Sequence, residues 1–257
     1  MATQGVEFAE VSFVVPGQGG TAGRRLLSDV SLTVEAGTTT ALLGRSGSGK
    51  TTLLRTVNAL VRPTSGTVSV GGRNVGSVDA IGLRRGIGYV IQQTGLFPHM
   101  TISENVGLPL KLGADLPRGM GEYWGRVESA MEKVGLPLQQ FGDRYPWLLS
   151  GGQQQRAGVA RALVNDPVVL LMDEPFGALD PLTRAEMQTM LRELLRRVGT
   201  TTLLVTHDLE EALYVADRVV LLEAGCVVAD LPADEVRGSE NKAVREYVAA
   251  TRREGAL

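Results

Sequence analysis

The chain has 257 residues, of which 43% are hydrophobic and 21% are charged, the balance of an ordinary globular protein. Its 26 Lys and Arg against 28 Asp and Glu leave a net charge of −2, so we expect no nucleic-acid partner. The longest apolar runs fall far below the roughly 18 residues of a membrane-spanning helix, and the first residues, MATQGVEFAEV, lack the pattern of a signal peptide. One cysteine excludes an intramolecular disulfide and fits a reducing cytoplasm; with only two histidines, a Cys/His zinc site is not expected.

Apolar periodicity and turn residues predict alternating strands and helices along the chain. Strands are expected at residues 6–15, 32–34, 39–43, 67–70, 87–91, 168–172 and 202–205. Helices are expected at residues 51–60, 152–165, 182–197, 209–216 and 241–251, and residues 96–149 have a helical, loop-rich pattern. The alternation predicts an α/β fold with a mostly parallel sheet.

Residues 17–22, GQGGTA, mimic a dinucleotide-binding fingerprint. No helix-forming run follows them, so a hairpin loop is the better interpretation.

A second glycine-rich segment carries a much more specific pattern. It matches G-x-x-x-x-G-K-[ST] between a predicted strand and a predicted helix, and with the residue that follows it comprises Gly44, Arg45, Ser46, Gly47, Ser48, Gly49, Lys50, Thr51 and Thr52. Glycines let backbone N–H groups converge on phosphate oxygens, and the helix start adds its dipole. Lys50 would neutralise β- and γ-phosphate charge, and the Thr51 hydroxyl would ligate Mg²⁺. The alternative is a chance glycine-rich turn.

Acidic residues follow the predicted strand at 168–172. Asp173 is placed to hold Mg²⁺, and Glu174 could polarise an attacking water as general base, because ligands bind at the carboxyl ends of strands in open α/β sheets. A solvated acidic turn is the alternative. His207 follows another predicted strand and could bond the γ-phosphate or position water, although a lone histidine is often a surface or packing residue.

The sequence Leu149-Ser150-Gly151-Gly152-Gln153 opens a further predicted helix, with Ser150 as its N-cap and two glycines exposing backbone donors. A P-loop hydrolase with one site does not need a second anion cradle. With both cradles, nearly the whole chain resembles the ATP-binding cassette (ABC) ATPases. The resemblance implies one domain over 1–257, with a RecA-like, mostly parallel core at about 1–95 and 160–235, an antiparallel β-subdomain, a helical subdomain inserted at about 96–159, and a C-terminal helix at about 241–251.

The resemblance also implies roles. Residues 44–52 look like Walker A, residues 168–173 like Walker B with Glu174 as the catalytic carboxylate, and residues 149–153 like the signature. Gln92 resembles the Q-loop glutamine that contacts Mg²⁺ and the attacking water. Two alternatives stay open: Gln92 is an ordinary polar residue at a strand end, or the neighbouring Gln93 has the Q-loop role. Asp180 lies in a D-loop-like Ala178-Leu179-Asp180, and His207 resembles the switch histidine.

Family members pair head to tail, so Ser150, Gly151, Gly152 and Gln153 of one copy would cap an ATP held by Lys50 of the other. Residues 93–105, QTGLFPHMTISEN, resemble the importer region that receives a permease helix, unless Leu96, Phe97 and Met100 are plain core. Residues 89–93, 143–146 and 172–183 look closest to osmoprotectant importers of the glycine betaine, carnitine and choline type.

The resemblance therefore implies an ATPase, with ATP and Mg²⁺, that forms a homodimer on the cytoplasmic face of the inner (plasma) membrane. Its partners would be transmembrane permease subunits and, indirectly, a substrate-binding protein. The alternatives are the ATPase of an exporter or lipid-handling system, and a soluble ABC regulator without a transport role.

One position departs from the family pattern. Many cassettes stack an aromatic ring on adenine from a run like F-x-Y-P-G, whereas this chain has Phe13-Val14-Val15-Pro16-Gly17. We expect Val15 to meet the base without a ring, which predicts modest ATP affinity and weak discrimination against GTP. Phe13 could substitute, because strand alternation places it on the same face as Val15.

Overall fold

The computed structural model describes residues 5–17, 23–112 and 117–254. The chain forms two compact units, the first made of residues 1–80 and 201–257 and the second of residues 81–200. Within the described ranges, no helix is both long and apolar enough to cross a lipid bilayer.

The first unit contains two groups of strands. Its elements are β1 (Val6–Val15), β2 (Arg24–Val34), β3 (Thr39–Leu43), α1 (Lys50–Val57), β4 (Ser65–Val70), β5 (Arg73–Asn74), β8 (Thr201–Thr206), α8 (Leu209–Val215), β9 (Arg218–Glu223), β10 (Cys226–Pro232), a 3₁₀ turn (Val236–Gly238) and α9 (Lys242–Glu254). An antiparallel sheet has the order β2-β1-β4-β5. In the other group, β3 runs parallel to β8 and β9, and β10 pairs antiparallel with β9.

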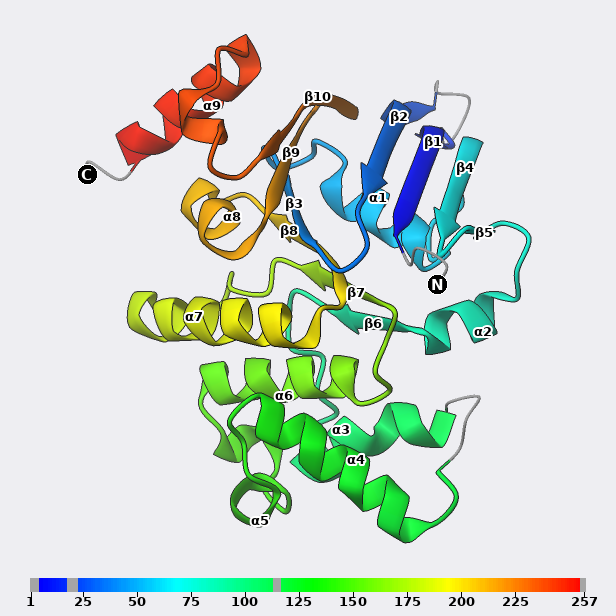
Figure 1. The fold of residues 1–257 in the computed structure, drawn as a ribbon, viewed down its shortest axis with the longest axis vertical. Helices are drawn as coiled ribbons and strands as arrows, with labels where there is room; N and C mark the ends of the chain where they lie inside the picture. The colour runs from blue at the N-terminus through cyan, green and yellow to red at the C-terminus, as the bar shows by residue number, and fades with distance from the viewer. Residues whose placement is uncertain (1–4, 18–22, 113–116, 255–257) are drawn as a thin grey trace. The chain divides into compact units, whose positions relative to one another are not determined.

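Helix α1 contacts both groups of strands, through β2 and β4 on one side and β8 on the other (Figure 1). Every residue of β3 and β8 is buried, which explains their short, continuous apolar and β-branched runs. This burial fixes the carboxyl ends of both strands, where the P-loop and His207 follow.

The second unit combines a parallel strand pair with a helical bundle. Its elements are α2 (Ala80–Arg85), β6 (Ile87–Val90), α3 (Ile102–Leu112), α4 (Met120–Lys133), α5 (Leu138–Phe141), a 3₁₀ turn (Pro146–Leu148), α6 (Gly151–Leu163), β7 (Val169–Asp173) and α7 (Pro181–Val198). Strands β6 and β7 pair in parallel. Helix α6 is central, since it contacts α3, α4, α7 and β6 (Figure 1).

The predicted α/β class, with parallel strands and a separate antiparallel sheet, is confirmed. Several details differ, among them the start of β2, at Arg24 rather than at residue 32. The helix expected at 51–60 ends at Val57, because the chain turns at Asn58 and Ala59 adopts a φ of 54°. Strands β5, β9 and β10 and helix α2 were not expected. Helix α6 ends at Leu163, two residues before the expected end at 165; the domain division stays a prediction.

The glycine-rich hairpin loop lies mostly outside the described residues, at 18–22. The strands on either side of it pair antiparallel, with Val15 opposite Arg24, as a hairpin requires.

Candidate functional site

The P-loop connects β3 to α1 in the first unit. At two of its glycines, neighbouring backbone atoms leave no room for a side chain. A Cβ on Gly44 would lie 2.3 Å from the Leu222 carbonyl oxygen, and a Cβ on Gly49 would lie 2.7 Å from that of Leu26. Both glycines have positive φ, 152° and 102°. The Gly225 amide donates to the Ser48 carbonyl at 3.1 Å, so the turn between β9 and β10 is tied to the loop. The loop therefore has a fixed shape.

The polar groups of this loop fit a phosphate ligand. Lys50 Nζ is buried and donates to the carbonyl oxygens of Gly44, at 2.7 Å, and Arg45, at 3.0 Å. Ser48 Oγ is buried and has no hydrogen-bond partner among the described residues. Gly49 precedes the eight-residue helix α1 and provides no side-chain cap. No capping side chain therefore competes with a phosphate for the first amides of the helix. Thr51 and Thr52 follow in the first turn, both half-buried.

His207 follows β8 in the same unit and is exposed. The residues on either side of it are held firmly. The Thr206 hydroxyl donates to Glu211 Oε2 at 2.6 Å and accepts from the Asp208 amide at 3.0 Å. Asp208 in turn caps α8 by accepting from the amides of Glu210 and Glu211.

The acidic pair lies at the end of β7 in the second unit. Asp173 is buried, and the Tyr89 hydroxyl donates to its Oδ2 at 3.4 Å. Glu174 adopts a φ of 47°, which is uncommon for a residue with a side chain and is a conformation that also occurs at active sites. Gln92 Nε2 donates to Glu174 Oε2 at 3.0 Å. The structure thus joins two of the residues expected to act on the attacking water.

The signature segment forms the predicted N-cap at α6. The Gln153 amide donates to Ser150 Oγ at 3.3 Å, and the Ser150 amide donates to Gln153 Oε1 at 3.0 Å. This reciprocal capping box leaves Gly151 and Gly152 at the helix start, where their amides carry the positive end of the dipole. The helix begins at Gly151, one residue earlier than expected.

The D-loop residue Asp180 is the N-cap of α7 and accepts from the Thr183 amide at 3.1 Å. Hydrogen bonds from Thr183 hold the pKa of Asp180 below its ordinary value, so the charged cap is present at neutral pH and is lost as the pH falls through that lowered pKa. A Cβ on Gly152 would lie 2.4 Å from Thr183 Cγ2, so signature and D-loop lie close together.

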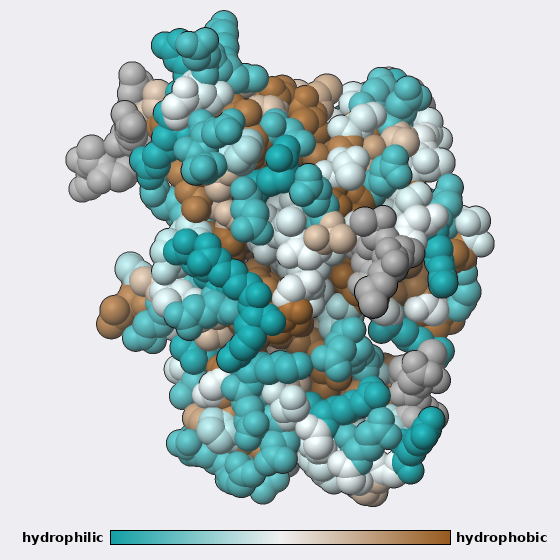
Figure 2. Space-filling model, in the orientation of Figure 1, coloured by the Kyte–Doolittle hydropathy of each residue, from teal (hydrophilic) through white to brown (hydrophobic). Residues whose placement is uncertain are grey.

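Figure 2 shows hydrophobic surface at the N-terminal end of α7, which carries Leu182, 72% exposed.

A residue that the sequence did not single out connects α6 to the Q-loop. The Arg161 guanidinium donates to the carbonyl oxygens of Gly95, at 2.7 Å, and Thr94, at 2.9 Å. Burial lowers the pKa of Arg161, because its charge is partly withdrawn from water. Only the structure shows this link, because 66 residues separate Arg161 from Gly95 and nothing in a lone helical arginine indicates its partner.

The Q-loop region lines a groove of about 600 Å³ in the second unit. Its walls expose Phe97, Ile81 and Leu112, which are 42%, 59% and 60% accessible. Arg84, Arg85 and Arg161 also line it, which gives the groove positive charge. The main chain of Phe97 is anchored on both sides by Asn105, which accepts from its amide at 2.7 Å and donates to its carbonyl at 3.1 Å. Phe97 is therefore an exposed side chain on a fixed backbone, whereas Leu96 and Met100 are half-buried.

A family model described as "ABC transporter" matches residues 27–177. The chain belongs to the ABC transporter family. Among curated ABC proteins, it is 46% identical over 82% of its length to the osmoprotectant import ATP-binding protein OsmV of Salmonella typhimurium. It is 44% identical over 90% of its length to the glycine betaine/carnitine/choline transport ATP-binding protein OpuCA of Bacillus subtilis. The chain spans only 55% and 60% of the length of these two ABC relatives.

Among solved ABC structures, the chain is similar to the ATP-binding cassette MJ0796, described as a dimer in a post-hydrolysis state bound to ADP and Pi. The TM-score is 0.78 and the identity 33%, over 89% of this chain and 98% of the other. The cassette fold expected from the sequence is therefore confirmed, and so is the resemblance to osmoprotectant ATP-binding subunits.

Proposed function

We propose that this chain is the ATP-hydrolysing subunit of an ABC importer. The observation that carries the proposal is the presence of two separate anion cradles, the P-loop before α1 and the Ser150-capped start of α6. One hydrolytic site needs only one of them. A pair of copies arranged head to tail uses both, because the signature of each copy then faces the nucleotide held by the other.

In this proposal each residue has a defined task. The P-loop amides and Lys50 bind the β- and γ-phosphates, Gln92 and Glu174 orient and deprotonate the attacking water, and His207 contacts the γ-phosphate. Thr51, Gln92 and Asp173 would hold Mg²⁺, which supplies positive charge to the transferring phosphoryl group when bound. The buried Ser48 hydroxyl, which has no hydrogen-bond partner in the described part of the chain, and the glycine cradle support a phosphate ligand there.

We further propose that the groove beside Phe97 receives a helix of a transmembrane permease subunit. An exposed apolar wall with arginines suits a partner helix that is apolar on one face and carries acidic groups or carbonyl ends. The subunit would then work at the cytoplasmic face of the membrane, with a substrate-binding protein supplying cargo from the other side. Quaternary amines of the glycine betaine type are the proposed cargo, supported by the two osmoprotectant relatives.

Two measurements test the proposal. Purified protein with Mg²⁺ and ATP should release phosphate, and Lys50→Ala should abolish this release. Co-expression with the permease genes beside its own, followed by uptake of labelled glycine betaine into vesicles loaded with ATP, tests import. Phosphate release without any association with a permease would favour a soluble regulator, and ATP-driven efflux would favour an exporter.

A further inference from the structure

Tyr247 contacts the main chain of the switch histidine. Its hydroxyl donates a hydrogen bond to the carbonyl oxygen of His207 at 2.6 Å, across 40 residues of sequence. Both residues belong to the first unit, Tyr247 on α9 and His207 directly after β8. The tyrosine therefore bonds the peptide of His207 itself, just before the start of α8.

Helix α9 is fixed well enough to act as a support. Val244 and Val248 are buried in an apolar cluster with Leu209 and Ala212 of α8, and the Tyr247 side chain packs against that cluster. The side chains of α9 that point inward thus pack on the same helix that begins just after His207. Because α8 and α9 pack together, the Tyr247 hydroxyl has a defined place relative to the His207 carbonyl.

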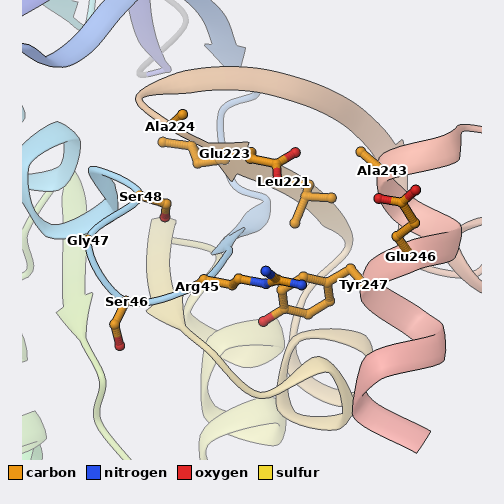
Figure 3. Close-up of a pocket in the computed structure, with 11 residues that line it drawn as sticks. Arg45, Ser46, Gly47, Ser48, Leu221, Glu223, Ala224, Ala243, Glu246 and Tyr247 are labelled. Atoms are coloured by element: carbon orange, nitrogen blue, oxygen red, sulfur yellow. The ribbon is translucent and has the colours of Figure 1, made fainter.

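Tyr247 also lies at the P-loop. It lines a pocket of about 240 Å³ together with Arg45, Ser46, Gly47 and Ser48. Figure 3 shows the loop on one side of the pocket and α9 on the other, with Arg45 extending from the loop toward the Tyr247 ring. The Tyr247 side chain therefore lines a pocket that it shares with the P-loop, and it also bonds the main chain of His207.

We propose that Tyr247 is a positioning residue for His207. Hydrogen bonds of Thr206 and Asp208 restrain the residues on either side of His207, and the Tyr247 hydroxyl restrains the His207 peptide itself. The imidazole is therefore held in one direction. The inference rests on the proposed ATPase activity. It adds α9 to the parts of the chain that set the rate of hydrolysis.

The physical consequence is specific. Loss of the hydroxyl leaves the His207 peptide with more orientations, and the imidazole then spends less time where it contacts the γ-phosphate. Nucleotide binding is assigned to the P-loop and Lys50, whose ammonium group is held by the carbonyl oxygens of Gly44 and Arg45. The substitution should therefore act on kcat and leave KM for ATP nearly unchanged.

The first test compares Tyr247→Phe with Thr251→Val, which removes a hydroxyl that donates within α9, to the carbonyl oxygens of Tyr247 and Val248. We expect Tyr247→Phe to lower kcat about three- to tenfold, in line with the loss of one hydrogen bond, with KM within about twofold. Thr251→Val should keep the kcat of the parent protein. In a His207→Ala background Tyr247→Phe should have no further effect, because residues that act as one unit are not additive.

The second test needs no nucleotide. The chain contains only two histidines, His99 and His207, so imidazole labelling with ¹³C and ¹⁵N gives two sets of resonances, assigned through His99→Gln. Tyr247→Phe should shift or broaden the His207 set and leave the His99 set in place. Thr251→Val should leave both unchanged.

The outcomes separate the two proposals. If the parent protein hydrolyses ATP and His207→Ala slows it, but Tyr247→Phe retains full kcat or slows the His207→Ala protein equally, the positioning role is wrong. Unchanged His207 resonances in Tyr247→Phe would also overturn it. If the parent protein does not hydrolyse ATP, the proposed function is wrong, and this inference is wrong with it.

Discussion

Gln92 donates its side-chain amide to the carboxylate of Glu174 at 3.0 Å, and Glu174 holds a φ of 47°. The positive φ sets the direction of the carboxylate at the end of β7, and the amide fixes one of its two oxygens. This contact places the proposed base and the Q-loop in one hydrogen-bonded unit.

We expect Glu174→Gln to keep ATP binding and to lose turnover by about two to four orders of magnitude, the usual contribution of a general base. Glutamine retains an oxygen that accepts from Gln92, but it lacks the basicity of the carboxylate. The variant should accumulate as a dimer with ATP and Mg²⁺ in size-exclusion chromatography. Turnover equal to that of the parent protein would show that Glu174 is not the base.

Variants of Ser150 separate its two roles, the N-cap and the contact with a partner's nucleotide. Ser150→Ala loses the capping box and should lower the free energy of unfolding by about 1 kcal/mol. Ser150→Asp keeps a cap but places a carboxylate beside the proposed phosphate site, so hydrolysis should fall while the thermal midpoint stays near that of the parent.

Ser150→Arg should strongly reduce hydrolysis and spare ATP binding to the monomer. Monomer affinity as low as in Lys50→Ala would contradict the action of Ser150 across the dimer.

Phe97→Asp should fold and hydrolyse ATP, yet fail to assemble with the permease or to support transport. The Phe97 backbone is anchored by Asn105, so the substitution changes only an exposed side chain of the groove. Leu60→Asp is a matched control, because Leu60 is also exposed, at 53%, and lies outside the groove. Pull-down of the permease, with a melting curve for each variant, is the measurement. An unfolded Phe97→Asp protein would show that Phe97 is part of the core.

Val15→Tyr should tighten ATP binding and raise the preference for ATP over GTP, since stacking on a base contributes about 1–3 kcal/mol in nucleic-acid binders. Val15 is 39% exposed and pairs with Arg24, whose guanidinium nitrogen lies 4.0 Å from the position of a Cβ on Gly47. That end of the hairpin therefore reaches the P-loop. Calorimetry with both nucleotides on the parent, Val15→Tyr and Phe13→Ala proteins measures the effect. If Phe13→Ala alone removes the ATP preference in a folded protein, Phe13 is the stacking residue.

The sequence was informative where residue chemistry is local. The glycines of the P-loop, the Ser150 cap and the strand ends that carry Asp173 and His207 all follow from patterns of a few residues, and the structure has the P-loop, the cap and the strand ends where those patterns placed them. The assigned catalytic, metal-binding and dimer roles stay predictions.

Contacts between residues far apart in the sequence could not be predicted from it. Arg161 with the Q-loop carbonyls and Tyr247 with His207 depend on how helices pack, and no short pattern specifies them. Strand alternation does not decide between Phe13 and Val15. The β1–β2 ladder shifts register between Phe13 and Val14, but the extra residue there is Leu26 of β2, so Phe13 and Val15 keep their two-residue spacing along β1.

The hydrogen bond from Gly225 to Ser48 has a practical consequence. The next residue is Cys226, the only cysteine of the chain, and it is exposed. A thiol-reactive fluorophore would therefore attach at one place in the unaltered sequence, one residue from a backbone contact with the P-loop. Changes in its emission on adding nucleotide would give a binding isotherm for every variant above without radioactive label, and stopped-flow mixing would resolve how fast the loop engages its ligand.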